Sequence, residues 1–232
     1  METETVDFLI IGSGVAGLRA AKELAPHGNV LVATKDMPKE SSTEYAQGGI
    51  AVALSDEDKV GIHFEDTLKA GDGLCNEDAV KILVEEGPER ILELISWGAA
   101  FDKEGTKLDF TIEGAHSRKR VLHARGDSTG KELERVLLNK VRSFPSVKKY
   151  PFAFTVDLII KDGECCGAYI LKDRKMTAII AKATILCTGG AGQLFARTTN
   201  PMVATGDGMA IAFRAGAQLE DMEFIQFHPT SL

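Results

Sequence analysis

The feature that most constrains this chain is a glycine motif between two short apolar segments near its start. The buried-strand pattern "VDFLII" (residues 6–11) leads into Gly12, Gly14 and Gly17, the helical pattern "LRAAKELA" follows, and "NVLVAT" (29–34) is typical of a second strand. A strand, a glycine turn, a helix and a parallel strand within about thirty residues form a βαβ unit. In such a unit the first glycine makes the tight turn, the second lets the backbone approach a pyrophosphate, and the third lets helix and strand pack closely. The motif therefore predicts a nucleotide-binding α/β fold.

The rest of the 232 residues continues this fold as one doubly wound, Rossmann-like α/β domain. Asn76 is expected to cap a helix that reaches Gly98 and is interrupted around Gly87 and Pro88, and a second helical pattern covers 131–144. These helices belong to an insert over about 60–145. From residue 152 the hydrophobic period becomes two, and the turns "KDGE" and "KDRK" divide the segment into a three-stranded antiparallel β-meander over about 152–182. "ATILCTGGAG" then predicts a return to a buried strand, and "GDGMAIAFRAGA" a short helix.

Charge and cysteine usage exclude several classes of function. The net charge of -7 gives no electrostatic reason to expect nucleic acid or an anionic membrane as a partner. No stretch approaches the roughly 18 to 20 apolar residues of a membrane span, and the N-terminus lacks the basic region of a signal peptide. The cysteines form no C-x-x-C pair and are expected to be buried free thiols: Cys75, Cys165, Cys166 and Cys187. We therefore expect a cytoplasmic protein in a reducing compartment.

Residues 41–53, "SSTEYAQGGIAVA", are a second unusual segment, because paired glycines are costly in both helix and strand. Placed directly after the βαβ unit, this segment resembles the flavin-contact segment of the fumarate reductase and succinate dehydrogenase flavoprotein superfamily, which includes the L-aspartate oxidase family. Further motifs in the superfamily's order are "EGAHSRKRVLHARGDSTGKEL", "ATILCTGGAGQLF", "TTNP", "TGDGMAIAFRAGA" and "EFIQFHPTSL". Lys35 also matches; it stands where an NAD site would carry an acidic residue for the ribose, and by itself it could equally suggest NADP.

The resemblance implies FAD as the cofactor. Respiratory members resemble "SHTxAAQGG", whose histidine is covalently attached to the flavin, and here Ser42 holds that position. Non-covalent FAD follows, and "STxYAQGG" is the pattern of the L-aspartate oxidase family. The cofactor-binding residues implied by the matched positions are Gly12, Ser13, Gly14, Val15, Ala16, Gly17, Lys35, Ser42, Thr43, Glu44, Tyr45, Ala46, Gln47, Gly48, Gly49, Phe154, Thr155 and Asp207.

Three residues are implied to act on the substrate. Glu113 lies in "IEGAHSRKRVLHA", which resembles the "REGGHS…RILHA" stretch of L-aspartate oxidases, where the glutamate recognises the α-ammonium group. A carboxylate there would discriminate aspartate from succinate electrostatically; the alternative is a solvated surface glutamate. His228 and Thr230, in "HPT", resemble the residues that hold a substrate carboxylate, with a satisfied core histidine as the alternative for His228.

Other polar residues carry weaker signals. The basic cluster at 118–120 is expected to be a solvated face, and His27 and His63 are expected on loops or the surface. The five histidines lack the paired spacing of a zinc site, so no metal is expected. Asp207 could cap its helix instead of serving the flavin site.

The implied activity is FAD-dependent oxidation of L-aspartate to iminoaspartate, the first step of de novo NAD biosynthesis. Oxygen or fumarate would reoxidise the flavin, and quinolinate synthase would use the product. Two alternatives stay open: a soluble fumarate reductase or other dicarboxylate dehydrogenase, and a non-catalytic FAD-binding fragment. The second arises because residues 1–232 are expected to be an FAD-binding domain without the family's capping domain, C-terminal helical domain or catalytic arginine.

Overall fold

The computed structural model describes residues 1–227 and divides the chain into two compact units. The first unit consists of Met1–Glu44 together with the chain from Leu137 onward, and the second is Tyr45–Val136. The second unit contains most of the predicted helical insert.

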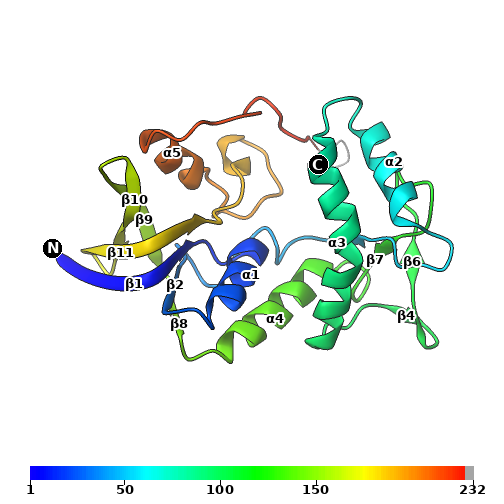
Figure 1. Cartoon of the computed structure of the whole chain (residues 1–232), viewed down its shortest axis with the longest axis horizontal. Coiled ribbons are helices and arrows are strands. Elements are labelled where there is room, and N and C mark those ends of the chain that lie inside the picture. Colours follow the sequence, from blue (N-terminus) through cyan, green and yellow to red (C-terminus); the bar gives the residue numbers. More distant parts are fainter. Residues whose placement is uncertain (228–232) are drawn as a thin grey trace. The chain divides into compact units, whose positions relative to one another are not determined.

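The first unit is built on a six-stranded sheet of order β8-β2-β1-β11-β10-β9 (Figure 1). The pairs β8–β2, β2–β1 and β1–β11 are parallel, and β10 is antiparallel to both β11 and β9. Leu9, Leu31 and Ile179 are fully buried, as expected for strands covered on both faces. The predicted α/β fold with an antiparallel meander is confirmed. The strands are β1 (Glu2–Ile11), β2 (Val30–Ala33), β8 (Val147–Tyr150), β9 (Ala153–Lys161), β10 (Glu164–Lys172) and β11 (Lys175–Leu186).

The third meander strand and the returning strand are a single element, so the prediction of two separate strands was wrong. β11 pairs antiparallel with β10 over its first half and parallel with β1 along nearly its whole length. Its sequence, "KMTAIIAKATIL", contains neither glycine nor proline, and nothing in it favours a turn. One strand therefore joins the meander to the parallel sheet and ends beside β1, where Ile11 pairs with Leu186.

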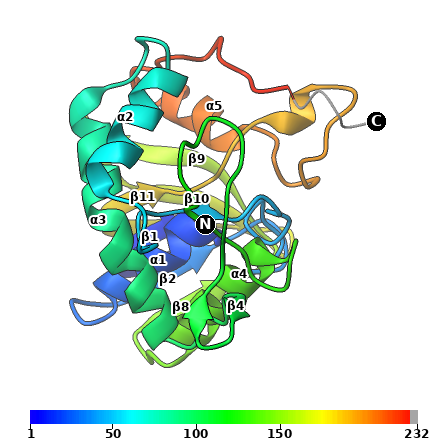
Figure 2. The same cartoon turned by 90° about the vertical axis from the view of Figure 1, so that its right-hand side faces the viewer.

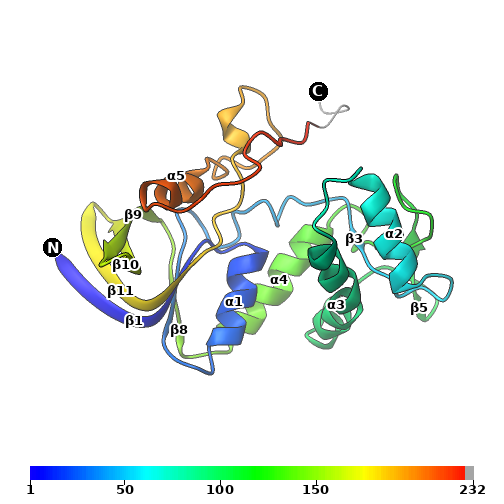
Figure 3. The same ribbon diagram turned by 45° about the horizontal axis from the view of Figure 1, so that its top comes forward.

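Two helices of the first unit pack on this sheet (Figure 3). α1 (Val15–Leu24) packs on β1 and β2 through Gly17, Leu18 and Ala21, which are buried. α5 (Asp207–Arg214) packs against β9 and buries Gly208 and Ile211. A 3-10 turn, η1 (Gly192–Leu194), lies between β11 and α5, and α4 (Thr129–Arg142) begins in the second unit and ends in the first.

The second unit combines a helix pair with short strands (Figure 2). α2 (Val60–Ala70) packs against α3 (Glu77–Ser96). The strands β3 (Ile50–Ala51), β7 (Val121–Leu122) and β6 (Phe110–Thr111) form one sheet, and β4 (Lys103–Glu104) pairs with β5 (Lys107–Leu108). The unit has its own apolar core, formed by Val52, Ile91, Ala99, Phe101, Leu122, Ala124 and Val136.

α3 confirms one sequence expectation and contradicts another. The Asn76 side chain accepts a hydrogen bond from the Ala79 amide at 3.0 Å, which is the predicted cap. The expected interruption near Pro88 is wrong, because the helix continues to Ser96. Val84 and Ile91 are buried on either side of the proline, so packing holds the helix together where proline removes one backbone hydrogen bond.

The cysteines are free thiols, as expected, but none is buried. Cys165 is exposed, and Cys75, Cys166 and Cys187 are half-buried. Among residues 1–227, no helix has the length and apolar character needed to cross a membrane.

Candidate functional site

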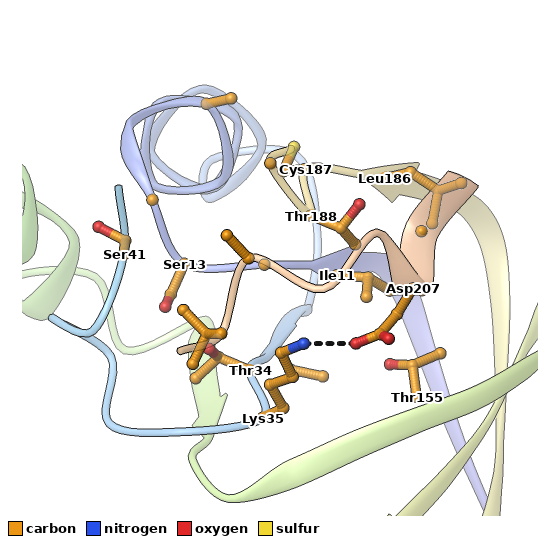
Figure 4. Close-up of a pocket in the computed structure, with 18 of the residues that line it drawn as sticks. Ile11, Ser13, Thr34, Lys35, Ser41, Thr155, Leu186, Cys187, Thr188 and Asp207 are labelled. Atoms are coloured by element: carbon orange, nitrogen blue, oxygen red, sulfur yellow. Dashed lines mark hydrogen bonds and ion pairs between the residues drawn. The ribbon is translucent and has the colours of Figure 1, made fainter. Parts of the chain in front are cut away.

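The candidate site is a pocket of about 310 Å³ in the first unit, at the carboxyl ends of β1, β2 and β11 (Figure 4). Open α/β sheets bind ligands at this edge, and the volume is at the lower end of small-molecule sites. The lining residues are Ile11, Gly12, Ser13, Gly14, Val15, Ala16, Ala33, Thr34, Lys35, Glu40, Ser41, Ser42, Thr43, Ala153, Phe154, Thr155, Leu186, Cys187, Thr188, Gly189, Gly190, Val203, Ala204, Asp207, Gly208 and Ile211.

The three glycines of the first motif have different structural roles. Gly12 has φ 110°, and a Cβ there would collide with the carbonyl oxygen of Cys187. A Cβ on Gly17 would collide with the carbonyl oxygen of Gly12. The atoms nearest to a Cβ on Gly14 would be Thr43 Oγ1 at 3.3 Å and the Ser41 side chain at 3.6 Å and beyond. Gly12 and Gly17 are thus required by the fold, whereas the bare backbone of Gly14 leaves space in the pocket wall.

The first turn of α1 gives the pocket a positive end. Gly14 occupies the N-cap, and no acidic side chain lies in the first turn. The Val15 amide donates to Thr43 Oγ1 at 3.1 Å, and the Ser13 hydroxyl donates to the carbonyl of Pro38 at 2.8 Å, which anchors the turn. A helix N-terminus next to a glycine backbone can bind a phosphate through its amides and its dipole. The pocket is therefore suited to an anionic nucleotide.

Lys35 and Asp207 form an ion pair in the pocket wall (Figure 4). The Lys35 ammonium contacts the Asp207 carboxylate and the Thr205 hydroxyl, which ties the end of β2 to the start of α5. Asp207 does not cap α5, because Gly206 holds the N-cap position with φ 75° and Asp207 lies in the first turn. Since its charge is paired, Lys35 is a poor partner for the 2′-phosphate of NADP.

The remaining predicted cofactor residues divide between the units. Ser42, Thr43, Phe154 and Thr155 line the pocket together with Val15 and Ala16. Glu44 belongs to the first unit but is not among the lining residues.

Tyr45, Ala46, Gln47, Gly48 and Gly49 belong to the second unit. The first four of them are exposed, and a Cβ on Gly48 would meet open space. Gly49 is needed by the fold of that unit, because it has φ 77° and a Cβ there would lie 2.7 Å from the carbonyl oxygen of Leu122.

The segment that follows β11 also lines the pocket, although it was not among the predicted cofactor residues. Cys187, Thr188, Gly189 and Gly190 line the pocket beside the glycine turn of residues 12–17, where the Cys187 carbonyl oxygen lies against Gly12. Partial burial raises the pKa of the half-buried Cys187 thiol, so the thiol is neutral at ordinary pH. A glycine pair directly after a buried strand is the same signal that identified Gly12 and Gly14, and it could have identified this wall as well.

Glu113 lies in the loop between β6 and β7 in the second unit, with 46% of its side chain exposed. Its Oε1 lies 3.3 Å from Nε2 of His123, and the same nitrogen is 3.0 Å from the Thr111 hydroxyl. The carboxylate is thus oriented by a neighbour and still reachable. The predicted substrate residues His228 and Thr230 lie outside the described residues.

Two expectations about this region were wrong. Arg120 is completely buried instead of forming part of a solvated face, and His63 is buried on α2 instead of lying on the surface. Both side chains belong to a charged cluster with Asp58 and Asp66, which joins residues 58–66 to the distant residue 120. In the described part of the chain, no group of acidic, histidine and cysteine side chains could hold a metal ion.

Comparison with known proteins connects this geometry to a family. The sequence model of the family described as "FAD binding domain" matches residues 7–232. The chain belongs to this family. FAD is thereby confirmed as the expected cofactor.

Curated relatives carry the resemblance further. The chain is 49% identical to the chloroplastic L-aspartate oxidase of Arabidopsis thaliana, over 99% of this chain and 36% of that protein. It is 44% identical to the L-aspartate oxidase of Synechocystis sp., over 100% of this chain and 42% of that protein. The expected resemblance to L-aspartate oxidases is confirmed, and the chain spans well under half the length of these relatives.

Solved structures agree on the fold. The FrdA chain of E. coli quinol fumarate reductase superposes with a TM-score of 0.95 at 33% identity, over 100% of this chain and 40% of that chain. Sdh1 of Mycobacterium smegmatis in its apo form superposes with a TM-score of 0.93 at 34% identity, over 99% of this chain and 42% of that chain.

Proposed function

We propose that the complete protein containing this chain oxidises L-aspartate to iminoaspartate with FAD, as the first step of NAD biosynthesis. The observation that carries the proposal is the 44% to 49% identity to L-aspartate oxidases along essentially the whole chain. Oxygen or fumarate is the proposed electron acceptor, and quinolinate synthase the proposed consumer of the product. We further propose a cytoplasmic location, although the Arabidopsis relative is described as chloroplastic.

The pocket of the first unit fits the cofactor. Gly14 leaves room for a pyrophosphate, the α1 N-terminus supplies amides and a positive dipole, and Gly189 and Gly190 form a second wall without side chains. Phe154 and Thr155 are the proposed neighbours of the adenosine part. When bound, FAD supplies an acceptor for the hydride that leaves the substrate α-carbon.

The attachment of the cofactor is proposed to be non-covalent. Ser42 lines the pocket at the position where respiratory relatives of the superfamily are expected to carry the linking histidine. A serine hydroxyl offers no imidazole nitrogen for that bond.

Substrate recognition is proposed to depend on charge. The Glu113 carboxylate, half exposed and oriented by His123, would pair with the α-ammonium of L-aspartate. His228 and Thr230 would donate hydrogen bonds to a substrate carboxylate. Succinate and fumarate lack the ammonium, so Glu113 would favour aspartate over both.

Two other functions compete with this one. The TM-score of 0.95 to E. coli quinol fumarate reductase FrdA favours a fumarate reductase or another dicarboxylate dehydrogenase. A protein that binds FAD without catalysing a reaction is the second alternative.

Anaerobic mixing of the FAD-loaded complete protein with single substrates tests the proposal. L-aspartate should bleach the flavin absorbance, D-aspartate and succinate should not, and later addition of oxygen or fumarate should restore the colour. Bleaching by succinate instead of L-aspartate would establish the dicarboxylate dehydrogenase. Bound flavin that no substrate bleaches would establish the non-catalytic alternative.

A further inference from the structure

The loop that carries Glu113 is anchored by a buried charged cluster in the second unit. The loop, residues 112–120, connects β6 to β7, and all its side chains except His116 and Arg120 are exposed. Burial of apolar side chains therefore does little to hold it. We call the set of Arg120, Asp58, Asp66 and Ser117 the loop anchor.

Arg120 is held first by Asp58. Its Nε donates to Asp58 Oδ2 at 2.8 Å and one terminal nitrogen donates to Oδ1 at 2.9 Å, which is a bidentate pair. Both side chains are fully buried. This pair neutralises the guanidinium charge in the interior, where an uncompensated charge would be strongly destabilising.

Asp66 supplies the second attachment and reaches the loop itself. Its Oδ2 accepts from the other terminal nitrogen of Arg120 at 2.7 Å. The same oxygen accepts from the backbone amide of Ser117 and from its hydroxyl, each at 2.8 Å. Because Asp66 lies on α2, one carboxylate ties the middle and the end of the loop to that helix.

The carboxylate of Asp66 stays charged at every working pH. Burial alone would raise its pKa, but the hydrogen bonds from Ser117 and Arg120 outweigh burial and hold the pKa at about 2. His116, on the loop, has its Nδ1 3.4 Å from Arg120, and its ring lies edge-on to that of buried His63 at 5.9 Å. Burial lowers the pKa of His63, so the His63 imidazole is neutral at ordinary pH.

We propose that Asp66 is a positioning residue for substrate choice: through Ser117 and Arg120 it fixes the 112–120 loop and thereby the carboxylate of Glu113. The proposal rests on the proposed function, because it assumes that Glu113 reads the substrate ammonium. Asp66 acts only through the loop and touches no reacting atom.

Asp66→Ala in the complete, FAD-loaded protein is the decisive variant. Arg120 keeps its bidentate partner Asp58, so the buried charge stays paired and the fold should survive. A displaced recognition group typically costs up to a hundredfold, so KM for L-aspartate should rise about ten- to hundredfold with a smaller change in kcat. Turnover of fumarate, which has no ammonium, should change much less. Asp56→Ala is the matched control, since Asp56 is an exposed residue of the same unit that forms an ion pair with Lys107.

A double-mutant cycle distinguishes an effect of Asp66 on the position of Glu113 from a non-specific loss of activity. If Asp66 acts through Glu113, adding Asp66→Ala to Glu113→Gln should cost little beyond the single Glu113→Gln change. Additive losses, or equal losses for aspartate and fumarate, would overturn the proposal. Hydrogen exchange adds a readout independent of activity: the amides of residues 112–119 should exchange faster in Asp66→Ala than in Asp56→Ala.

Different results would contradict the proposed function and the proposed role of the loop anchor. A wild-type protein that does not oxidise L-aspartate removes the proposed function, and with it the role of Asp66 in substrate choice. Unchanged exchange in residues 112–119 removes the anchor itself. Faster exchange with an unchanged KM for L-aspartate would show that the anchor does not position Glu113.

Discussion

Gly14→Ala should weaken FAD binding while leaving the stability of the fold nearly unchanged. The added methyl would lie 3.3 Å from Thr43 Oγ1, a tight contact that a shift of the hydroxyl can relieve. The backbone of Gly14 has φ −70°, which any residue adopts. Gly12→Ala is the contrasting variant, because φ 110° and the nearby Cys187 carbonyl oxygen leave no place for a methyl. Only the Gly12 substitution should therefore damage the fold itself.

The expected magnitudes make the two effects distinguishable. Alanine at an N-cap costs about 1 kcal/mol or less relative to glycine. The methyl of Gly14→Ala would stand where a pyrophosphate approaches the amides of Val15 and Ala16, and each charge-assisted hydrogen bond lost is worth roughly 1.5 to 3 kcal/mol. The Kd for FAD should thus rise about ten- to two-hundredfold.

Two measurements on the complete protein, stripped of flavin, check this prediction. Quenching of FAD fluorescence gives Kd, and urea unfolding without FAD gives the free energy of unfolding. Gly14→Ala should lose affinity with little loss of stability, and Gly12→Ala should lose both. The reasoning is refuted if Gly14→Ala binds FAD with the wild-type Kd, or if without FAD it is as unstable as Gly12→Ala.

Three further predictions concern attachment, substrate and pH. Acid or heat denaturation should release all the yellow chromophore, because Ser42 cannot form the covalent bond; colour left in the precipitated protein would contradict this. Glu113→Gln should lower kcat/KM for L-aspartate about ten- to two-hundredfold and affect fumarate much less, and equal losses at unchanged FAD content would show that Glu113 does not read the amine. Because the pKa of Asp66 is lowered from 3.8 to about 2, its contribution to stability is complete above about pH 4 and is lost as the pH falls toward 2. Asp66→Asn should lose stability less steeply than wild type between about pH 4 and 2 in urea unfolding, and identical slopes would argue against the anchor as described.

Features that depend on neighbours in the sequence could be predicted. The glycine turn before α1, the Asn76 cap and the meander strands follow from short-range patterns of apolar residues, caps and turns. The pocket lies beside this predicted glycine turn, because parallel strands bring their carboxyl ends to one edge of the sheet. The assignment of individual cofactor residues at that edge stays a prediction.

Features that depend on distant partners could not be predicted. Arg118 and Lys119 are exposed, as expected for a basic cluster. Arg120 is buried because its guanidinium pairs with Asp58 and Asp66, which lie 62 and 54 residues earlier in the chain. α3 runs through Pro88 because buried side chains on both sides hold it, and β11 is one strand because β1 and β10 supply partners along its length. Local sequence determined which segments become helix, strand and glycine turn. Only the tertiary structure decided which charged side chains are buried and where a helix or strand continues past an expected end. These outcomes depend on contacts with residues that are far away in the sequence.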